Sequence, residues 1–273
     1  MDRDANRGKT ALITGASGGI GREIATELAA RGTNLILTAR RAEALDEAAT
    51  ALQARHGVDV DTITLDLGEI AGFERGPENS GADRLFAEIE ARNLTVDMLI
   101  NNAGFGLYGL HTETDLDREQ QMIDLNIAAL TRLTKFVLPG MIARGHGRIM
   151  NVGSVASFVP GPYMAVYYAT KAYVLSYSEA LGEELRGTGV TVTALCPGPT
   201  QSGFEEAAEA GASPLFKGKL PTARTVAAYG VRAMERGRPV AIHGVSNNLL
   251  VQSLRLLPRS VVSRIVARMS KGR

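Results

Sequence analysis

The sequence predicts an α/β fold in which helices cover both faces of one parallel sheet. Along nearly the whole chain, short apolar runs alternate with longer segments whose apolar residues recur at helical spacing, a pattern typical of doubly wound sheets. A glycine-rich turn joins the first apolar run to the first helical segment. The chain has 273 residues and 45% hydrophobic content, so we expect a single domain over residues 1–273.

Seven apolar runs are expected to be strands, because each is short and is bounded by residues typical of turns or loops. A loop rich in Gly, Pro, Asn and Glu is expected over residues 68–81. The strands cover residues 10–13, 34–39, 60–65, 96–100, 147–152, 190–195 and 239–243. Helices are expected from Ile20 through Leu28, up to about Arg55, and over residues 82–92, 115–143 and 222–236.

The turn after the first strand contains Gly15, Gly19 and Gly21 in a G-x-x-x-G-x-G pattern. Glycine permits positive φ and lets the backbone approach a ligand closely. The next helix begins at this turn, and its N-terminus offers N–H groups and a partial positive charge that suit a pyrophosphate. Tight strand–helix turns also use glycine for steric reasons, but the position after the first strand favours dinucleotide binding.

The end of the second strand is where the adenosine ribose of a dinucleotide should lie. Arg40 and Arg41 follow that strand, and the first acid is Glu43. Arginine accommodates a 2′-phosphate, whereas an acid favours a free 2′-hydroxyl, so the pair predicts NADP(H) rather than NAD(H). The other interpretation is that two arginines simply open a solvated helix. Asp66 follows the third strand, where its carboxylate could accept a hydrogen bond from the adenine amine.

A hydroxyl, two tyrosines and a lysine follow the fifth strand. Tyr167 and Lys171 are four residues apart and therefore lie on one face of a helix. A free tyrosine titrates near pH ~10, and a nearby ammonium is expected to lower the pKa of the phenol. Ser154 precedes them across a loop containing Pro160, which can return the hydroxyl toward the tyrosine. Tyr168 is also a helical neighbour of Lys171, so geometry alone leaves both tyrosines open.

Composition excludes several classes of protein. Cys196 is the only cysteine, which excludes an intrachain disulfide and a cysteine metal cluster. His111, His146 and His243 show no metal-ligand spacing, so no metal site is predicted. The first ten residues lack the apolar segment of a signal peptide, and no apolar run reaches the ~18 residues of a membrane span. We therefore expect a cytoplasmic enzyme that binds no nucleic acid.

The C-terminal segment is basic and amphipathic. Residues 236–273 hold eight Lys or Arg and no Asp or Glu, which leaves 22 of the 30 basic residues, against 29 acidic ones, to the rest of the chain. Apolar residues at helical spacing precede and follow Pro258, so we expect a helical extension over residues 246–273, with proline in the first turn of its second helix. Packing over the substrate cleft or against another subunit is favoured, and contact with an anionic membrane surface is the alternative.

Taken together, these motifs resemble the short-chain dehydrogenase/reductase family, over residues 9–243. They occur in the order and at the separations usual in that family. The resemblance implies a Rossmann-like, seven-stranded sheet and selects Tyr167 over Tyr168 by its distance from the serine. The matching residues are Thr14, Gly15, Gly19, Ile20 and Gly21, then Asn102, Ala103 and Gly104, then Asn126, Ser154, Tyr167 and Lys171, and finally Pro197 and Gly198.

The resemblance also implies a role for each member of the catalytic tetrad. Tyr167 is the general acid/base at the substrate oxygen, and Lys171 lowers the pKa of that tyrosine and binds the nicotinamide ribose. Ser154 positions and polarises the carbonyl. Asn126 holds a water that continues the proton relay.

Cofactor contacts are expected along the carboxyl edge of the sheet. Near the nicotinamide, the resemblance implies that Ser202 contacts the carboxamide, and Thr200 competes for that role. The residues expected to bind the cofactor are Gly15, Ser17, Gly19, Ile20, Gly21, Arg40, Arg41, Asp66, Asn102, Ala103, Gly104, Tyr167, Lys171, Pro197, Gly198, Thr200 and Ser202.

We therefore expect an enzyme that transfers a hydride between NADP(H) and a partly apolar carbonyl or alcohol substrate, most simply a carbonyl reductase, and that assembles as a homodimer or homotetramer. A non-catalytic NADP(H)-binding regulator is the alternative, although the intact tetrad argues against it. A nucleotide-sugar epimerase fits less well, because the chain is short and its glycine spacing differs. Five residues are expected to shape a partly apolar pocket: Phe158, Tyr163, Phe204, Leu215 and Phe216. The other interpretation is that these side chains serve only packing.

Overall fold

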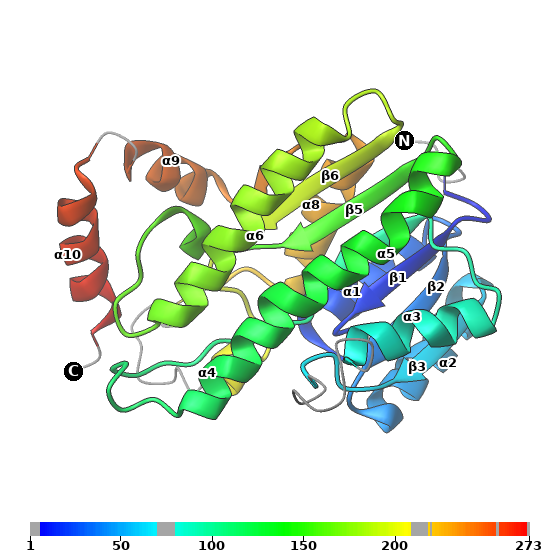
Figure 1. Ribbon diagram of the computed structural model, residues 1–273, viewed down its shortest axis with the longest axis horizontal. Coiled ribbons are helices and arrows are strands. Elements are labelled where there is room, and N and C mark those ends of the chain that lie inside the picture. The colour runs from blue at the N-terminus through cyan, green and yellow to red at the C-terminus, as the bar shows by residue number, and fades with distance from the viewer. Residues whose placement is uncertain (1–5, 70–79, 209–217, 219, 255–256, 272–273) are drawn as a thin grey trace.

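The computed structural model describes residues 6–69, 80–208, 218, 220–254 and 257–271. Its centre is a seven-stranded parallel sheet in the order β3-β2-β1-β4-β5-β6-β7 (Figure 1). The predicted doubly wound α/β fold is therefore confirmed. The strands are β1 (Thr10–Thr14), β2 (Asn34–Ala39), β3 (Val60–Thr64), β4 (Met98–Asn101), β5 (Gly147–Val152), β6 (Val190–Cys196) and β7 (Val240–Ile242).

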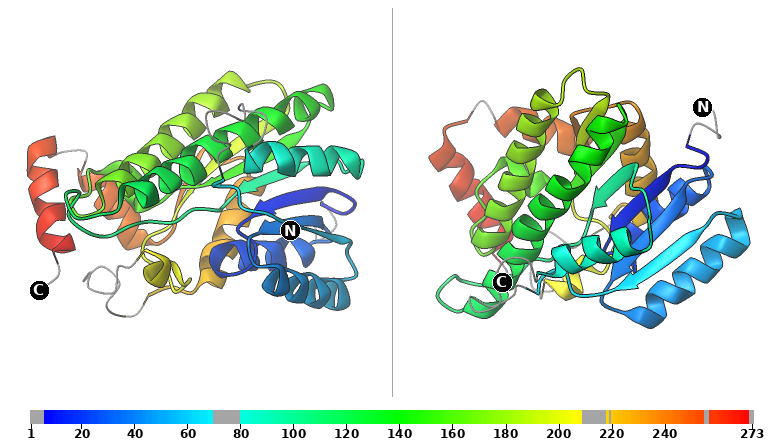
Figure 2. Two further views of the ribbon diagram at one scale, coloured as in Figure 1. Left: turned by 60° about the horizontal axis from the view of Figure 1, so that its bottom comes forward. Right: turned by 45° about the vertical axis from the view of Figure 1, so that its right-hand side comes forward.

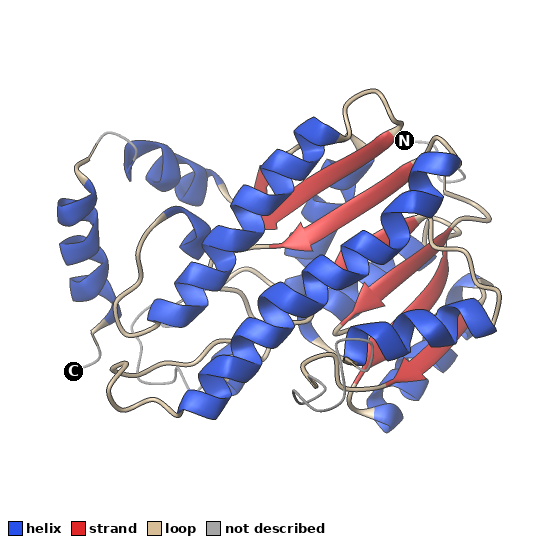
Figure 3. Cartoon of the chain, viewed as in Figure 1, coloured by secondary structure: helices blue, strands red, loops and turns tan. Residues whose placement is uncertain are grey.

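Neighbouring residues of the central strand β1 belong to different apolar clusters. Ala11 and Ile13 pack with residues of α1, α2 and α8, whereas Leu12 packs with residues of α3, α5 and α6. Figure 3 shows the strands lying between these two layers of helices. Both faces of the sheet are thus buried, which explains why the strands appear in the sequence as continuous apolar runs.

Three strands are shorter than predicted, and one of them, β3, simply ends one residue early at Thr64. β4 begins at Met98 rather than at Val96, because Asp97 uses its groups to hold β1: its N–H donates to the Thr10 carbonyl (2.9 Å) and its carboxylate accepts from the Thr10 N–H (3.0 Å). β7 is confined to three residues that pair with the end of β6.

The helices cover the predicted segments, with two short additions. Ser80 and Asp83 form a capping box at the start of α3, which explains why that helix begins at residue 81. The short helix α7 and the 3-10 helix η3 were not predicted. The helices are α1 (Gly19–Ala29), α2 (Ala42–His56), α3 (Gly81–Ala91), α4 (Leu116–Ile123), α5 (Leu130–Ala143), η3 (Val155–Phe158), α6 (Ala165–Glu184), α7 (Phe204–Ala207), α8 (Ala223–Glu235), α9 (Val245–Leu254) and α10 (Arg259–Ser270).

The helical region predicted over residues 115–143 is confirmed, but it is not α-helical throughout. A π-helix, η2 (Asp124–Ala129), joins α4 to α5, and π-helical turns inside α-helices frequently occur at functional sites. Asn126 lies in η2 and is buried. Its side chain bonds to both main-chain groups of Phe105, so the π turn holds this amide against the loop that follows β4.

The strand order reverses between β1 and β4, and this reversal places the site. In open α/β sheets, ligands bind at the carboxyl ends of the strands where the order reverses. The glycine turn follows β1, and the loop beginning at Asn102 follows β4. Asn102 Nδ2 donates to the Thr14 carbonyl (2.9 Å) and to the Gly15 carbonyl (3.2 Å), so the two loops form one structural unit.

Helices α9 and α10 lie at the end of the molecule toward which β5 and β6 point (Figures 1 and 2). We predicted Pro258 in the first turn of the second C-terminal helix. It is instead the N-cap of α10, one position before that turn. Val251 of α9 packs in a cluster with residues of η3, and Val262 and Val266 of α10 pack in the cluster that contains Tyr167. No described helix is both long and apolar enough to cross a bilayer.

Candidate active site

Ser154, Tyr167 and Lys171 meet at the carboxyl end of β5. Ser154 caps η3, and its Oγ accepts a hydrogen bond from the Ala156 N–H at 3.1 Å. Tyr167 and Lys171 lie one turn apart on α6, with Lys171 Nζ 5.8 Å from the centre of the Tyr167 ring. Nζ donates a 2.8 Å hydrogen bond to the Val152 carbonyl. The structure therefore brings together the hydroxyl, the phenol and the ammonium that the sequence singled out.

Burial controls the ionisation of this group, since Tyr167 is only 8% and Lys171 only 6% exposed. Desolvation raises the pKa of the Tyr167 phenol, and the polar interaction with Ser154 lowers that pKa by less. Desolvation also lowers the pKa of Lys171 to about 8. Burial is thus the largest effect on the Tyr167 pKa, and the ammonium is directed to the Val152 carbonyl, so the lowering of that pKa by Lys171 stays a prediction. At neutral pH the phenol is protonated.

Tyr168 has different surroundings. Its ring meets that of Tyr167 edge-on, with centroids 6.0 Å apart and planes at 79°. It packs over Gly161, where a Cβ would collide with the ring, and it lies beside Ser270 of α10. Tyr168 therefore packs between a loop and α10, whereas Tyr167 is the tyrosine that lies next to both Ser154 and Lys171.

Asn126 borders the same group from η2. Its Oδ1 accepts from the Phe105 N–H (3.2 Å), and its Nδ2 donates to the Phe105 carbonyl and to Thr170 Oγ1 (both 3.0 Å). Gly104 lies beside both Asn126 and Lys171: a Cβ there would be 2.7 Å from Asn126 Oδ1 and 3.6 Å from Lys171 Nζ. The four predicted residues of the tetrad are thus contiguous, and the space between two of them requires glycine.

The glycine turn has the backbone conformation that a dinucleotide site needs. Gly15 and Gly19 have φ of +67° and +54°, in the region that favours glycine. A Cβ at Gly21 would collide with the Gly15 carbonyl and with Asn102 Nδ2. Helix α1 begins at Gly19 with no side-chain cap, so its N-terminus remains available for a pyrophosphate.

Thr14 joins this turn to the loop after β4. Its Oγ1 accepts hydrogen bonds from the N–H groups of Asn102 (3.0 Å) and Ala103 (2.9 Å). Ile20, at the other end of the turn, packs partly buried against the core beneath it. Thr14 was predicted to be part of the motif but not of the site, and the structure shows it holding two site loops together.

Arg40 and Arg41 have different partners. Arg41 Nη2 lies 3.5 Å from Ser17 Oγ and would lie 3.4 Å from a Cβ on Gly18, so its guanidinium sits over the glycine turn. Arg40 is instead directed to Asp66, with 3.5 Å between their charged groups and 71% of its side chain exposed. The structure thus brings Arg41 to the predicted dinucleotide turn and pairs Arg40 with the residue predicted to contact adenine.

The segment after β6 runs back toward the glycine turn. The Pro197 carbonyl accepts a 2.9 Å hydrogen bond from the first residue of η3. Thr200 Oγ1 donates to the Gly198 carbonyl (2.8 Å), so Thr200 is turned into its own loop. The Ser202 carbonyl oxygen would lie 2.7 Å from a Cβ on Gly19. Of the two residues proposed for the carboxamide contact, Ser202 therefore lies closer to the glycine turn.

Apolar side chains cover the other side of Tyr167. The ring of Phe204 lies 5.2 Å from that of Tyr167, and a Cβ on Gly106 would lie 2.8 Å from Phe204 and 3.0 Å from Met164. These residues share one apolar cluster with Leu107. A cavity of about 220 Å³ opens beside Met164, between residues 107–119 and residues 162–166.

The residues predicted to shape the pocket have different positions. Tyr163 lines the 220 Å³ cavity, has a φ of +68° and stacks on Tyr108 at 6.1 Å. Phe158 packs in a separate cluster with α9, so its role is packing. Leu215 and Phe216 lie outside the described residues.

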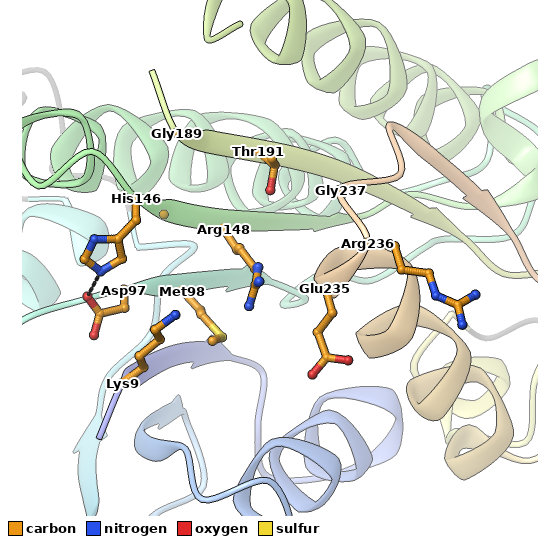
Figure 4. Close-up of a pocket in the computed structure, with 11 residues that line it drawn as sticks. Lys9, Asp97, Met98, His146, Arg148, Gly189, Thr191, Glu235, Arg236 and Gly237 are labelled. Carbon is orange, nitrogen blue, oxygen red and sulfur yellow. Dashed lines mark hydrogen bonds and ion pairs between the residues drawn. The ribbon is translucent and has the colours of Figure 1, made fainter. Parts of the chain in front are cut away.

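A second cavity, of about 310 Å³, lies at the opposite, amino ends of the strands (Figure 4). Several polar side chains of its lining have partners, as in His146 with Asp97 (3.1 Å) and Glu235 with Arg31 (2.8 Å). Its lining shares no residue with the predicted site, and ligands of such sheets bind at the carboxyl ends of the strands. The predicted site therefore lies at the other end of the sheet from this cavity.

A buried polar network beneath the site was not predicted. Asn101 Nδ2 donates to Asn151 Oδ1 (2.9 Å) and to Thr134 Oγ1 (3.1 Å), and Asn151 Nδ2 donates to Ser178 Oγ (2.9 Å). These bonds join β4 and β5 to α5 and α6, so they fix the helix that carries Tyr167. The signal was available, because an asparagine inside an apolar strand needs buried hydrogen-bond partners.

Comparison with known proteins agrees with this geometry. The family model of the short chain dehydrogenase matches residues 9–212. The very-long-chain 3-oxoacyl-CoA reductase of Mycosarcoma maydis is 35% identical over 196 residues, which are 71% of this chain and 53% of that protein. The uncharacterized oxidoreductase YvaG of Bacillus subtilis is 34% identical over 236 residues, 86% of this chain and 83% of that one. The chain thus spans about half the length of the first relative.

Solved structures show the same similarity. A short-chain dehydrogenase from Sphingobium yanoikuyae in complex with NADPH has a TM-score of 0.76 and 31% identity, covering 91% of this chain and 94% of its own. A short chain dehydrogenase/reductase from Burkholderia phymatum in complex with NAD has a TM-score of 0.78 and 26% identity, covering 92% and 95%. With a family model matching most of its length and the tetrad assembled, the chain belongs to the short-chain dehydrogenase family.

Proposed function

We propose that the protein is an oxidoreductase that transfers a hydride between NADP(H) and a carbonyl or alcohol carbon, acting chiefly as a carbonyl reductase. The observation that carries this proposal is the grouping of Ser154, Tyr167 and Lys171 at the strand ends that also present the glycine turn. Such a group can hold a substrate oxygen and deliver a proton to it, and that is the acid/base half of a carbonyl reduction.

The residues present fit a nicotinamide dinucleotide. A Cβ at Gly21 would fill the cradle of the turn, and the N-terminus of α1 is available to a pyrophosphate. When bound, the nicotinamide supplies or accepts the hydride. Ser17 and Arg41 together offer a hydroxyl and a guanidinium, which suit a 2′-phosphate and support NADP(H) over NAD(H).

Tyr167 is the proton donor in this proposal. A buried phenol with a raised pKa is protonated at neutral pH, so it is present in the form that gives a proton to the carbonyl oxygen during reduction. Ser154 offers a second hydrogen bond to the same oxygen. Lys171, whose pKa is lowered to about 8, can return a proton to the phenolate more readily than an ordinary lysine. Asn126 keeps the π turn beside that ammonium.

The substrate is expected to be partly apolar. Phe204, Met164 and Leu107 share the cluster that surrounds Tyr167, so the carbon next to the reacting carbonyl would meet an apolar surface. One relative is named as a very-long-chain 3-oxoacyl-CoA reductase. Reduction of a 3-oxo group on an apolar chain fits the apolar surface around Tyr167. Long-chain 3-oxoacyl thioesters and apolar ketones are therefore the first substrates to test.

The test is NADPH consumption, followed by absorbance, with a panel of ketones, aldehydes and 3-oxoacyl thioesters. Tyr167→Phe should lower turnover by about 10²-fold or more, the usual contribution of a positioned acid/base, while NADPH affinity stays nearly unchanged. Tyr168→Phe is the matched control and should keep most of the activity. Loss of turnover in Tyr168→Phe with activity retained in Tyr167→Phe would overturn the assignment.

The alternative is a regulator that binds NADP(H) without turnover. The covering of Tyr167 by Phe204 is the observation that favours it. Tight NADPH binding, measured by fluorescence titration, with no turnover in either direction across the panel would support this alternative and contradict the enzymatic proposal.

A further inference from the structure

Helix α10 has a buried face and an exposed apolar stripe directly beside it. The buried residues, four apart, are Val262, Val266 and Ser270. The exposed stripe, one position earlier in each turn, is Val261, Ile265 and Met269, with 37%, 36% and 46% of each residue exposed. Packing on the body of the protein therefore leaves a second apolar face of this helix in solvent.

Basic side chains flank this stripe. Arg264 and Arg268 each precede a residue of the stripe, Ile265 and Met269, by one position. At about 100° per residue, they lie next to the stripe on the side away from the buried face. Both are exposed, as is Lys271. Within the part of the chain that the structure describes, none of these cations has a carboxylate partner within 4.0 Å. We call Val261, Ile265, Met269 and these three cations the α10 outer face.

The C-terminal segment that carries the α10 outer face bears charges of one sign. The sequence has no Asp or Glu from residue 236 to its end. Helix α9 adds further exposed apolar side chains nearby in the chain, with Leu249 66% exposed and Leu250 44% exposed. An amphipathic helix with an apolar stripe and flanking Arg and Lys is the pattern of helices that lie in a membrane interface.

We propose that the α10 outer face docks on an anionic membrane surface, with the helix lying parallel to the bilayer. Lipid headgroups supply the negative charge that the face lacks, and the acyl region just below them accepts Val261, Ile265 and Met269, while the long arginine side chains reach up to the phosphates. A second copy of the chain is a poorer occupant, because a two-fold contact brings the same cations of both copies together.

The contact is expected to be weak and reversible. The apolar stripe is short, and attraction between exposed cations and a charged surface is screened by salt. Docking would also place next to the bilayer the helix whose inner face packs in the cluster around Tyr167. The proposal does not depend on turnover and is tested by binding alone.

The experiment measures co-sedimentation of the full chain with vesicles of phosphatidylcholine, with and without phosphatidylglycerol, at low and high salt. Two double variants test the face, Arg264→Glu with Arg268→Glu, and Val261→Asn with Ile265→Asn. Ile142→Asn, 44% exposed on α5, and Arg186→Glu, exposed after α6, are matched controls. Circular dichroism confirms that each variant is folded, and light scattering gives its molar mass.

The native chain should sediment with phosphatidylglycerol vesicles at low salt and be released at high salt. Each double variant should bind at least about tenfold more weakly, and the controls should bind like the native chain. Failure of the folded native chain to bind these vesicles would overturn the proposal. A double variant that halves the molar mass with vesicle binding unchanged would also overturn it, and would show the face to be a contact between copies.

Discussion

Replacement of Lys171 by methionine is expected to make the cofactor-free protein more stable at neutral pH. Burial lowers the pKa of Lys171 from 10.5 to about 8. Because the folded pKa lies below the unfolded one, the charged form is disfavoured by folding. The cost is fully present below the folded pKa of about 8 and disappears as the pH rises toward the unfolded value of 10.5.

The shift corresponds to roughly 3 kcal/mol of lost stability at pH 7 and to less than about 1 kcal/mol at pH 10. Against this gain, methionine removes the hydrogen bond to the Val152 carbonyl, and leaving that acceptor without its donor costs about 1–2 kcal/mol. Methionine fills a similar volume. Lys171→Met should therefore stabilise the fold by about 1–2 kcal/mol at pH 7 and destabilise it slightly at pH 10.

Urea unfolding at the two pH values measures this difference, provided that the m-value is unchanged. Lys135→Met, at an exposed position on α5, is the matched control and should change stability by less than about 0.5 kcal/mol at both pH values. A variant less stable than the native chain at pH 7, or equally altered at both pH values, would refute the reasoning that burial governs this lysine.

Three further predictions concern single contacts. Arg41→Ala should raise the NADPH dissociation constant by about tenfold to a hundredfold, as measured by fluorescence titration, with Arg40→Ala and NADH affinity far less affected. Burial raises the pKa of Asp83, but its hydrogen bonds lower that pKa by more. The carboxylate therefore contributes stability above its unfolded pKa of 3.8, and this stability is lost as the pH falls through the folded pKa. Asp83→Asn should cost roughly 3 kcal/mol at neutral pH and make the stability depend less on pH in the acid range. Gly189→Ala should lower Tm strongly, because φ is +82° and a Cβ would collide with a carbonyl of the neighbouring loop, whereas Gly57→Ala, at φ +67° with open space around it, should cost only about 1 kcal/mol.

The strands and the site loops could be predicted because their signals are local. Ala11, Leu12 and Ile13 are all apolar since β1 is buried on both faces, and a run of this kind is visible in any short window. Gly15 and Gly19 are required by their positive φ, which also depends on a few adjacent residues. The tetrad came from its family spacing, and the structure places its members side by side.

The remaining features depend on contacts between distant segments. Arg40 and Arg41 look equivalent in sequence, and only the positions of Asp66 and Ser17 separate them. The raised pKa of Tyr167 reflects how deeply the ring is buried, which no spacing reveals.

The π-helix η2 also constrains the length of the chain around Asn126. Each residue of an α-helix turns the chain by about 100°, and the wider π turn absorbs part of that rotation between α4 and α5. Met122 of α4 therefore reaches the cluster around Tyr167, while Leu133 of α5 reaches the core beneath the sheet. Deleting one residue here would rotate α4 by about 100° and carry Met122 away from the site. The number of residues in this segment therefore matters as much as the asparagine. Insertions and deletions here should be tolerated no better than substitution of Asn126 itself.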